Sequence, residues 1–290
     1  MTNLTYTNCR LCPRACGVDR TKGQRGFCGQ PDGLRVAKVM RHFWEEPVLA
    51  GEGGSGAIFF SGCTLGCLYC QNHQISTGQQ GDRIDSAVLR AHMEDLISQG
   101  AENVDLVTPT HFLPDILPAL QPKLPVPVVY NCGGYESVET LKALEGLVDV
   151  YLPDFKYGDN ALAFQLSGAK DYFSVAADAI KEMVRQVGPC VMEGEKLKKG
   201  VLIRHLILPG HIENSLKVLD WIGETFPKGT VLVSLMRQYT PMERVQNMPP
   251  LNRTITEEEY EAVLSWMYLN DLDGFTQEAE AASQEFIPDF

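Results

Sequence analysis

Three closely spaced cysteines are the residues of this chain best suited to chemistry. Cys63, Cys67 and Cys70 lie in the segment SGCTLGCLYCQN and follow the pattern C-x3-C-x2-C. Cysteine thiolates bind iron–sulfur clusters, and this spacing lets one loop wrap a single [4Fe–4S] cluster. Three protein ligands leave one iron open, and an open coordination position is typical of a metal site that does chemistry. The alternative is a structural zinc, or a closed cluster completed by a distant ligand such as Cys132.

A second group of cysteines lies near the N-terminus. Its spacing is C-x2-C-x3-C-x11-C, and its members are Cys9, Cys12, Cys16 and Cys28. Four thiolates can close a tetrahedral zinc site or hold a whole iron–sulfur cluster. The sequence does not distinguish the two metals. The lobe therefore holds either a structural zinc or an auxiliary iron–sulfur cluster that relays electrons. The isolated Cys190 is typical of a small buried side chain.

Composition and charge narrow the class of protein. The chain has 290 residues, a net charge of −12 and 44% hydrophobic residues. Nucleic-acid binding is typical of basic surfaces, so the acidic balance argues against a nucleic-acid partner. No apolar run approaches the roughly 20 residues that span a bilayer, and residues 1–17 lack the apolar centre of a signal peptide. We therefore expect a cytoplasmic protein without membrane contact, whose cysteines bind metal rather than form disulfides.

Short apolar runs alternate with amphipathic stretches from about residue 55 onward. This alternation predicts a parallel sheet with helical crossovers, which places the chain in the α/β class. Strands are expected at 57–61, 104–108, 126–131, 148–154, 201–208 and 230–236. Helices are expected at 85–99, 113–120, 138–147, 161–186 with a break near Gly168, 213–226 and 256–269. Six units are too few for a closed eight-stranded barrel, so we predict a partial (β/α)6 barrel of the TIM type.

Three regions follow from this pattern. Residues 1–38 form a small Cys-rich metal-binding lobe, residues 39–250 the partial barrel, and residues 251–290 a C-terminal helix with an acidic tail. The tail, QEAEAASQEFIPDF, is expected either to cover the barrel or to project toward a partner.

Parallel α/β folds place their sites at the carboxyl ends of the strands. After the cysteine loop, the expected strands end in TPTH (108–111), NCGGY (131–135), PDFK (153–156), PGH (209–211) and MRQY (236–239). Arg204 lies within an apolar strand, where an unpaired charge is costly. We therefore expect an anionic partner for Arg204, either a buried carboxylate or a bound cofactor.

These motifs resemble the radical SAM superfamily. SGCTLGCLYCQN, placed after the first strand of an α/β domain, is similar to the loop that binds the [4Fe–4S] cluster of that superfamily. The resemblance implies that the amine and carboxylate of S-adenosylmethionine bind the open iron, with Tyr69 near the adenine. It also implies that reductive cleavage yields a 5′-deoxyadenosyl radical, which abstracts a hydrogen atom. Through HFWEEP, GSGAIFFSGC, TPTH and MRQYTP, residues 40–245 resemble pyruvate formate-lyase activating enzymes and a less studied group of activating-enzyme-like iron–sulfur proteins.

The resemblance implies roles for several strand-end residues. Asn131 and Asp154 match positions near the methionine part of the cofactor that can hold a monovalent cation. Lys156 matches a lysine that reaches the cofactor carboxylate, and an ordinary surface lysine is the alternative. Where the superfamily has a GGE-like motif for the cofactor amine, this chain has TPTH, in which Thr108 and Thr110 can supply acceptors.

Other strand-end residues have two interpretations each. His111 either faces the substrate or caps its strand end. Gly133 and Gly134 either let a ligand approach the backbone or form a plain turn. The aromatic residues at 42–44 either pack the lobe onto the barrel or line the mouth of the site. Candidates for contacts with substrate or ribose are Arg237, Gln238 and Tyr239.

The resemblance implies an oxidoreductase that cleaves S-adenosylmethionine and, as an activating enzyme, installs a glycyl radical on a partner enzyme. Its reductant would be a flavodoxin or a ferredoxin. One alternative is radical modification of a small molecule or peptide, which the TPTH replacement and the four-cysteine lobe favour. Another is a two-cluster electron carrier, for which so large an α/β domain is unnecessary.

Overall fold

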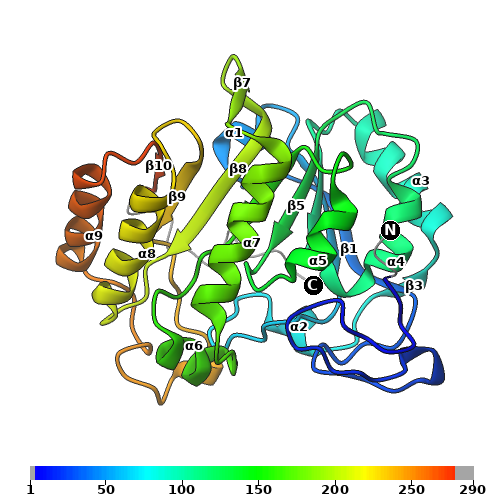
Figure 1. Ribbon diagram of the computed structural model, residues 1–290, viewed down its shortest axis with the longest axis horizontal. Coiled ribbons are helices and arrows are strands. Elements are labelled where there is room, and N and C mark those ends of the chain that lie inside the picture. The colour runs from blue at the N-terminus through cyan, green and yellow to red at the C-terminus, as the bar shows by residue number, and fades with distance from the viewer. Residues whose placement is uncertain (1–3, 278–290) are drawn as a thin grey trace.

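The protein is organised around one large sheet, seen in a computed structural model that describes residues 4–277 (Figure 1). All six predicted parallel strands are present and lie beside one another in chain order. They are β2 (Ser55–Phe60), β4 (Val104–Val107), β5 (Val128–Cys132), β6 (Val150–Pro153), β8 (Lys196–Leu206) and β9 (Leu232–Met236). Their short apolar sequences suit strands that are covered on both faces.

Four strands of the described chain were not predicted. β1 (Leu34–His42) pairs antiparallel with β2, and β3 (Asp82–Ile84) follows on its far side. β10 (Gly274–Thr276) extends the opposite edge beside β9, and β7 (Val191–Glu193) forms a hairpin with β8.

The four unpredicted strands affect two predicted features, the partial barrel and the boundary of the N-terminal lobe. Within residues 4–277 the sheet is open, with β3 and β10 at its two ends, so the partial-barrel curvature stays a prediction. β1 runs across the expected lobe boundary at residue 38. Residues 278–290 of the expected acidic tail lie outside the described residues.

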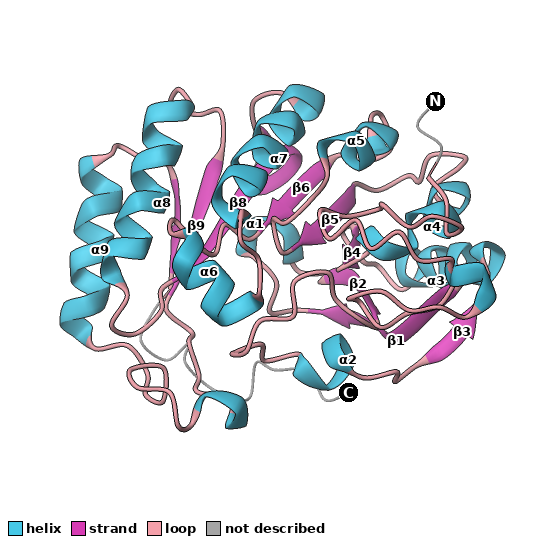
Figure 2. Cartoon of the chain, turned by 60° about the horizontal axis from the view of Figure 1, so that its bottom comes forward, coloured by secondary structure: helices cyan, strands magenta, loops and turns pink. Residues whose placement is uncertain are grey.

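Helices follow the strands much as the apolar periodicity predicts. They are α1 (Pro47–Ala50), α2 (His73–Thr77), α3 (Ser86–Ser98), α4 (Leu113–Ala119), α5 (Val138–Leu141), α6 (Asn160–Ser167), α7 (Tyr172–Val187), α8 (Ile212–Thr225) and α9 (Glu257–Leu269). Figure 2 shows α3, α5, α7 and α8 along one side of the strands.

Two helices differ in length from simple periodicity. The stretch at 161–186 breaks as predicted at Gly168, which ends α6 in the left-handed conformation at φ 63°. The helix expected at 138–147 is shorter, because α5 continues as the 3-10 turn Lys142–Leu144. None of the described helices is long and apolar enough to cross a membrane.

Strand register decides which side chains share a face of the sheet. Residues that pair across neighbouring strands point the same way. The register places Asp154, Arg204 and Ser234 in one row across the ends of β6, β8 and β9. Nearer the amino ends, α1 covers the same face with an apolar cluster: Val48, Leu49, Val129, Val150, Leu152 and Leu202. This face is therefore apolar under α1 and polar toward the carboxyl ends, where a site can form.

The turn after β5 requires a glycine at position 134. Gly134 has a φ of 77°, and a Cβ there would lie 2.2 Å from the carbonyl oxygen of Asp154. Gly134→Ala therefore combines a steric clash with left-handed strain, and we expect it to lower the free energy of unfolding by about 3 kcal/mol or more. Gly146 is the matched control, with a φ of 81° and no atom within 4 Å of such a Cβ. Gly146→Ala should cost only about 1 kcal/mol, and equal losses in urea denaturation would contradict the close approach at Gly134.

Candidate metal and cofactor site

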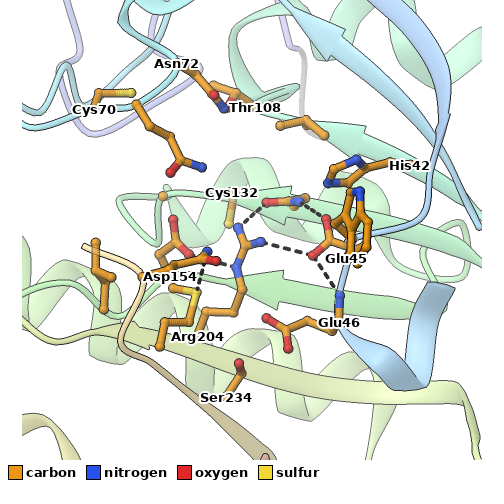
Figure 3. A pocket seen from close by; sticks show the side chains of 18 of the residues that line it. His42, Glu45, Glu46, Cys70, Asn72, Thr108, Cys132, Asp154, Arg204 and Ser234 are labelled. Atoms are coloured by element: carbon orange, nitrogen blue, oxygen red, sulfur yellow. Dashed lines mark hydrogen bonds and ion pairs between the residues drawn. The ribbon is translucent and has the colours of Figure 1, made fainter. Parts of the chain in front are cut away.

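A cavity of about 730 Å³ lies over the carboxyl ends of the parallel strands. It brings together every predicted residue of the cysteine loop and of the cofactor site. These lining residues are Cys63, Cys67, Tyr69, Cys70, Asn131, Asp154, Lys156 and Arg204. Figure 3 shows the strand-end side chains directed into the cavity. Its volume is in the range of pockets that enclose a small-molecule ligand.

The cysteine loop follows β2 and presents its sulfurs as hydrogen-bond acceptors. The Leu65 N–H donates to Cys63 Sγ at 3.3 Å, and the Ser167 hydroxyl donates to Cys67 Sγ at 3.2 Å. Hydrogen bonds of this kind tune cluster thiolates. Burial raises the pKa of Cys63 to about 12, with further contributions from Cys70 and Cys67. The thiolate form therefore needs a positive partner, which a metal supplies.

Three cysteine thiols on one loop are a donor set that fits a [4Fe–4S] cluster. Among residues 4–277, no three His, Cys, Asp or Glu side chains converge on an ion-sized site. In a [4Fe–4S] cluster each cysteine binds a different iron, so the ligands surround a group several atoms wide. Cys63, Cys67 and Cys70 line one cavity and influence one another electrostatically, so the three thiols lie close enough together to share one such group.

Paired charges occupy the strand ends next to the cysteines. Lys156 Nζ lies 2.6 Å from Asp154 Oδ2, and Arg204 Nε lies 2.9 Å from Asp154 Oδ1. Arg204 Nη2 also donates to Asn131 Oδ1 at 2.7 Å. Although burial opposes both shifts, the two cations hold the pKa of Asp154 below its usual value, and Asp154 raises the pKa of Lys156. All three groups are therefore charged at neutral pH, and Lys156 is no ordinary surface lysine.

Two acids that the sequence analysis missed complete this network. Glu45 Oε1 accepts from Arg204 Nη1 at 3.2 Å, so carboxylates are the anionic partners expected for Arg204. Asn131 Nδ2 lies 3.3 Å from both Glu45 Oε2 and Asp105 Oδ2. Burial and the neighbouring Glu45 raise the pKa of Asp105 well above its usual value. A signal for Asp105 existed, since it interrupts the apolar run VDLV as Arg204 interrupts its own strand.

Tyr69 and the end of β9 form another part of the wall. The Tyr69 ring is buried, with its centroid 6.0 Å from that of Tyr239. Gln238 and Tyr239 line the cavity as candidates for contacts with substrate or ribose. Arg237 does not join them, because its guanidinium pairs with Glu257 at 2.7 Å on the α9 side.

The TPTH segment divides between the cavity and the core. Thr108 lines the cavity, whereas the Thr110 hydroxyl donates to buried Glu136 at 2.9 Å. His111 is buried outside the cavity, and its Nε2 donates to the Ser61 carbonyl at 2.7 Å. The structure therefore supports the capping role for His111. The aromatic residues at 42–44, by contrast, line the cavity.

The N-terminal lobe packs directly on the cysteine loop. The Arg14 guanidinium donates to the carbonyl oxygens of Thr64 at 3.0 Å and Leu65 at 3.2 Å. Gly62 turns the chain at φ 84°, and a Cβ there would lie 2.6 Å from the carbonyl oxygen of Cys28. No side chain could fit between the lobe and the residue that precedes Cys63.

The four lobe cysteines lie near one another. Burial raises the pKa of Cys28, and Cys9 and Cys16 add to that shift. Burial likewise raises the pKa of Cys12, with smaller contributions from Cys28 and Cys9. As with the cysteine loop, the described side chains do not converge on an ion-sized site. A metal on this lobe stays a prediction.

Known proteins share parts of this chain. A 4Fe–4S single cluster domain matches residues 49–111, which include all three loop cysteines. The uncharacterized protein MJ0674 of Methanocaldococcus jannaschii is 32% identical over 278 residues, covering 92% of this chain and 76% of that protein.

Solved structures share the fold at low sequence identity. SuiB of Streptococcus suis bound to S-adenosylmethionine has a TM-score of 0.52 and 14% identity, covering 77% of this chain and 50% of that chain. A radical SAM methyltransferase from Sphaerobacter thermophilus has a TM-score of 0.51 and 12% identity. The match covers 86% of this chain and 78% of that chain. The chain thus spans about half the length of SuiB. It belongs to the protein family of MJ0674, its residues 49–111 match a 4Fe–4S single cluster domain, and it shares the fold of radical SAM enzymes.

Proposed function

We propose that this protein is a radical SAM enzyme that binds a [4Fe–4S] cluster on Cys63, Cys67 and Cys70 and cleaves S-adenosylmethionine reductively. One observation carries the proposal: three cluster-type thiols and a row of paired charges line the same strand-end cavity. When bound, the cluster supplies the electron for cleavage, and the resulting 5′-deoxyadenosyl radical abstracts a hydrogen atom.

The charged residues suit the methionine part of the cofactor. Lys156 lies near the cysteines, since its charge lowers the pKa of Cys70 against the larger effect of burial. Lys156 binds the cofactor carboxylate, and Asp154 accepts from the amine through lone pairs that its two cations leave open. Arg204 positions Asp154 and Asn131. Tyr69 lies in the cavity wall, where its ring can contact the adenine.

Cys67→Ala should abolish 5′-deoxyadenosine formation, because the cluster loses one of its three ligands. The protein is reconstituted anaerobically with iron and sulfide, reduced, and incubated with S-adenosylmethionine, and the nucleoside is quantified by chromatography. Cys190→Ala is the matched control, since that thiol contacts the Val201 carbonyl away from the cavity and its loss should leave the yield unchanged. Absence of nucleoside with the unaltered protein would reject the proposed activity. Full yield with Cys67→Ala would reject the ligand assignment.

The hydrogen donor is proposed to be a glycine of a partner glycyl-radical enzyme, with the electron delivered by a flavodoxin or ferredoxin. This follows the narrower resemblance to activating enzymes. A small molecule or peptide is the second candidate. It is supported by the fold shared with SuiB, which was crystallised with its precursor peptide SuiA, and by the TPTH segment in place of a GGE-like motif.

Electron paramagnetic resonance distinguishes these candidates. The active protein is incubated with candidate glycyl-radical enzymes, and a doublet from a backbone glycyl radical is expected if the first candidate holds. Omission of S-adenosylmethionine is the control and should remove the signal. Modified peptide or small molecule without any glycyl doublet would favour the second candidate.

A second metal site is proposed on Cys9, Cys12, Cys16 and Cys28. Their proximity and the lobe's contact with the cysteine loop support either a structural zinc or an auxiliary iron–sulfur cluster. Either metal would stabilise a segment whose apolar cluster is small, consisting mainly of Tyr6, Cys9 and Leu11.

Replacing Cys63, Cys67 and Cys70 together by alanine isolates the metal of the lobe. We expect the triple variant to retain about one zinc or about four irons per chain. Elemental analysis with a sulfide assay tells the two apart. Adding Cys12→Ala should release that metal, whereas adding Cys190→Ala should not. A triple variant that binds neither metal, while the intact protein still takes up its first cluster, would reject the second site.

A further inference from the structure

A buried acid without a cation lies at the end of the cavity away from the cysteines. Glu46 directly precedes α1, lines the cavity and is only 8% exposed. Ser234 also lines the cavity, and its hydroxyl favours the ionised form of Glu46. Within residues 4–277, no lysine or arginine forms an ion pair with it. Figure 3 shows Glu46 and Cys70 at opposite sides of the cavity, with Arg204 between them.

The nearest cation is already engaged by other acceptors. Arg204 pairs with Glu45 and Asp154 and donates its remaining terminal nitrogen to Asn131. Its charge reaches Glu46 only at a distance. A buried carboxylate without a counter-ion is costly, so an ionised Glu46 gains from a cationic partner at this position.

Two aromatic side chains from the segment just before Glu46 line the same cavity. Phe43 is 48% exposed and Trp44 is 68% exposed, and both line the cavity together with Glu46. Large aromatic side chains at a concave site favour the hydrocarbon part of a ligand, and their faces attract organic cations. An acid beside two such rings suits a group that is cationic at its tip and apolar along its stem.

We infer that Glu46 binds an alkylammonium group of the substrate, with Phe43 and Trp44 covering the adjoining hydrocarbon. This inference deepens the proposed radical function by naming the substrate class, and it rests on that function for the role of the site. Glu46 fixes which substrate enters and how it is oriented. The ammonium group comes either from a small amine or from a lysine side chain of a peptide.

Binding of two isosteric probes tests the inference without turnover. Benzylammonium and benzyl alcohol are titrated by calorimetry into the reconstituted protein at pH 8, with the cluster oxidised and S-adenosylmethionine present. The unaltered protein should bind benzylammonium at least about tenfold more tightly, as expected for a charge-assisted hydrogen bond in a buried site. Glu46→Gln should lose this preference and leave the affinity for benzyl alcohol unchanged. Ser234→Ala, which removes only a neutral neighbour of Glu46, should keep the preference.

The pH dependence gives a second measurement on the unaltered protein. Burial, followed by the neighbouring Glu45 charge, raises the pKa of Glu46 to about 7, and Asp154 adds to this. Arg204 and the Ser234 hydroxyl act in the opposite direction. Benzylammonium affinity should therefore rise from pH 6 to pH 8 as Glu46 ionises, and this rise should be missing in Glu46→Gln.

A peptide arm identifies the source of the ammonium group. A short lysine-containing peptide is compared with its norleucine analogue in the same titration. If only the lysine peptide binds more tightly than its norleucine analogue, and this difference depends on Glu46, the ammonium group comes from a lysine side chain. If benzylammonium binds more tightly than benzyl alcohol, and this difference depends on Glu46, the ammonium group comes from a small amine. Equal affinities within both pairs for the unaltered protein, or a preference that survives Glu46→Gln, would overturn the inference. These binding results are independent of whether 5′-deoxyadenosine forms.

Discussion

The buried ion pair between Arg204 and Asp154 is the interaction on which the cavity depends. It joins the ends of β6 and β8, and through its other nitrogens Arg204 also holds Asn131 of β5 and Glu45 before α1. Removing one partner of such a pair leaves a buried charge uncompensated, at a cost of about 3–5 kcal/mol. One guanidinium thus links the ends of β5, β6 and β8 to the segment that precedes α1.

The other end of the cavity is held by the N-terminal lobe. Arg14 reaches across to the backbone of the cysteine loop and also to the carbonyl of Ser167, whose hydroxyl contacts Cys67. The loop is thereby fixed by hydrogen bonds from a segment more than forty residues earlier in the chain. A loop positioned in this way can keep its three thiols arranged for a metal group without relying on its own short sequence.

Sequence patterns predicted the repeating part of the fold well, because each parallel strand and its helix carry their own apolar period. Gly168 marked a helix break for a local reason, its left-handed conformation. Apart from β7, which forms a local hairpin with β8, the additional strands escaped prediction because their pairing is not local. β1 mixes Arg35, Lys38 and Arg41 with apolar residues, and its antiparallel partners β2 and β3 make it a strand. β10 has three residues and gains its place from β9.

The candidate site was predictable where residues follow a strand in sequence, as for Asp154 and Lys156. The site was not predictable where its residues come from segments distant in sequence from those strand ends. Glu45 lies 159 positions before its partner Arg204, and no local sequence pattern predicts a contact between them. Asp105 was detectable in principle, since a lone acid in an apolar strand needs a partner. His111 could not be assigned until its contact with Ser61 placed it outside the cavity.

The exposed position of Trp44 gives the cavity an optical reporter of its own. The chain has three tryptophans. Trp221 packs in a T-shaped arrangement against Phe155, and the Trp266 indole donates to Asp220 at 2.6 Å. Both side chains are therefore held in the helical layer away from the site. Trp44 alone among the three lines the cavity, with most of its surface in water. A ligand that displaces that water should shift its fluorescence to shorter wavelength, so that filling of the cavity can be followed without a label.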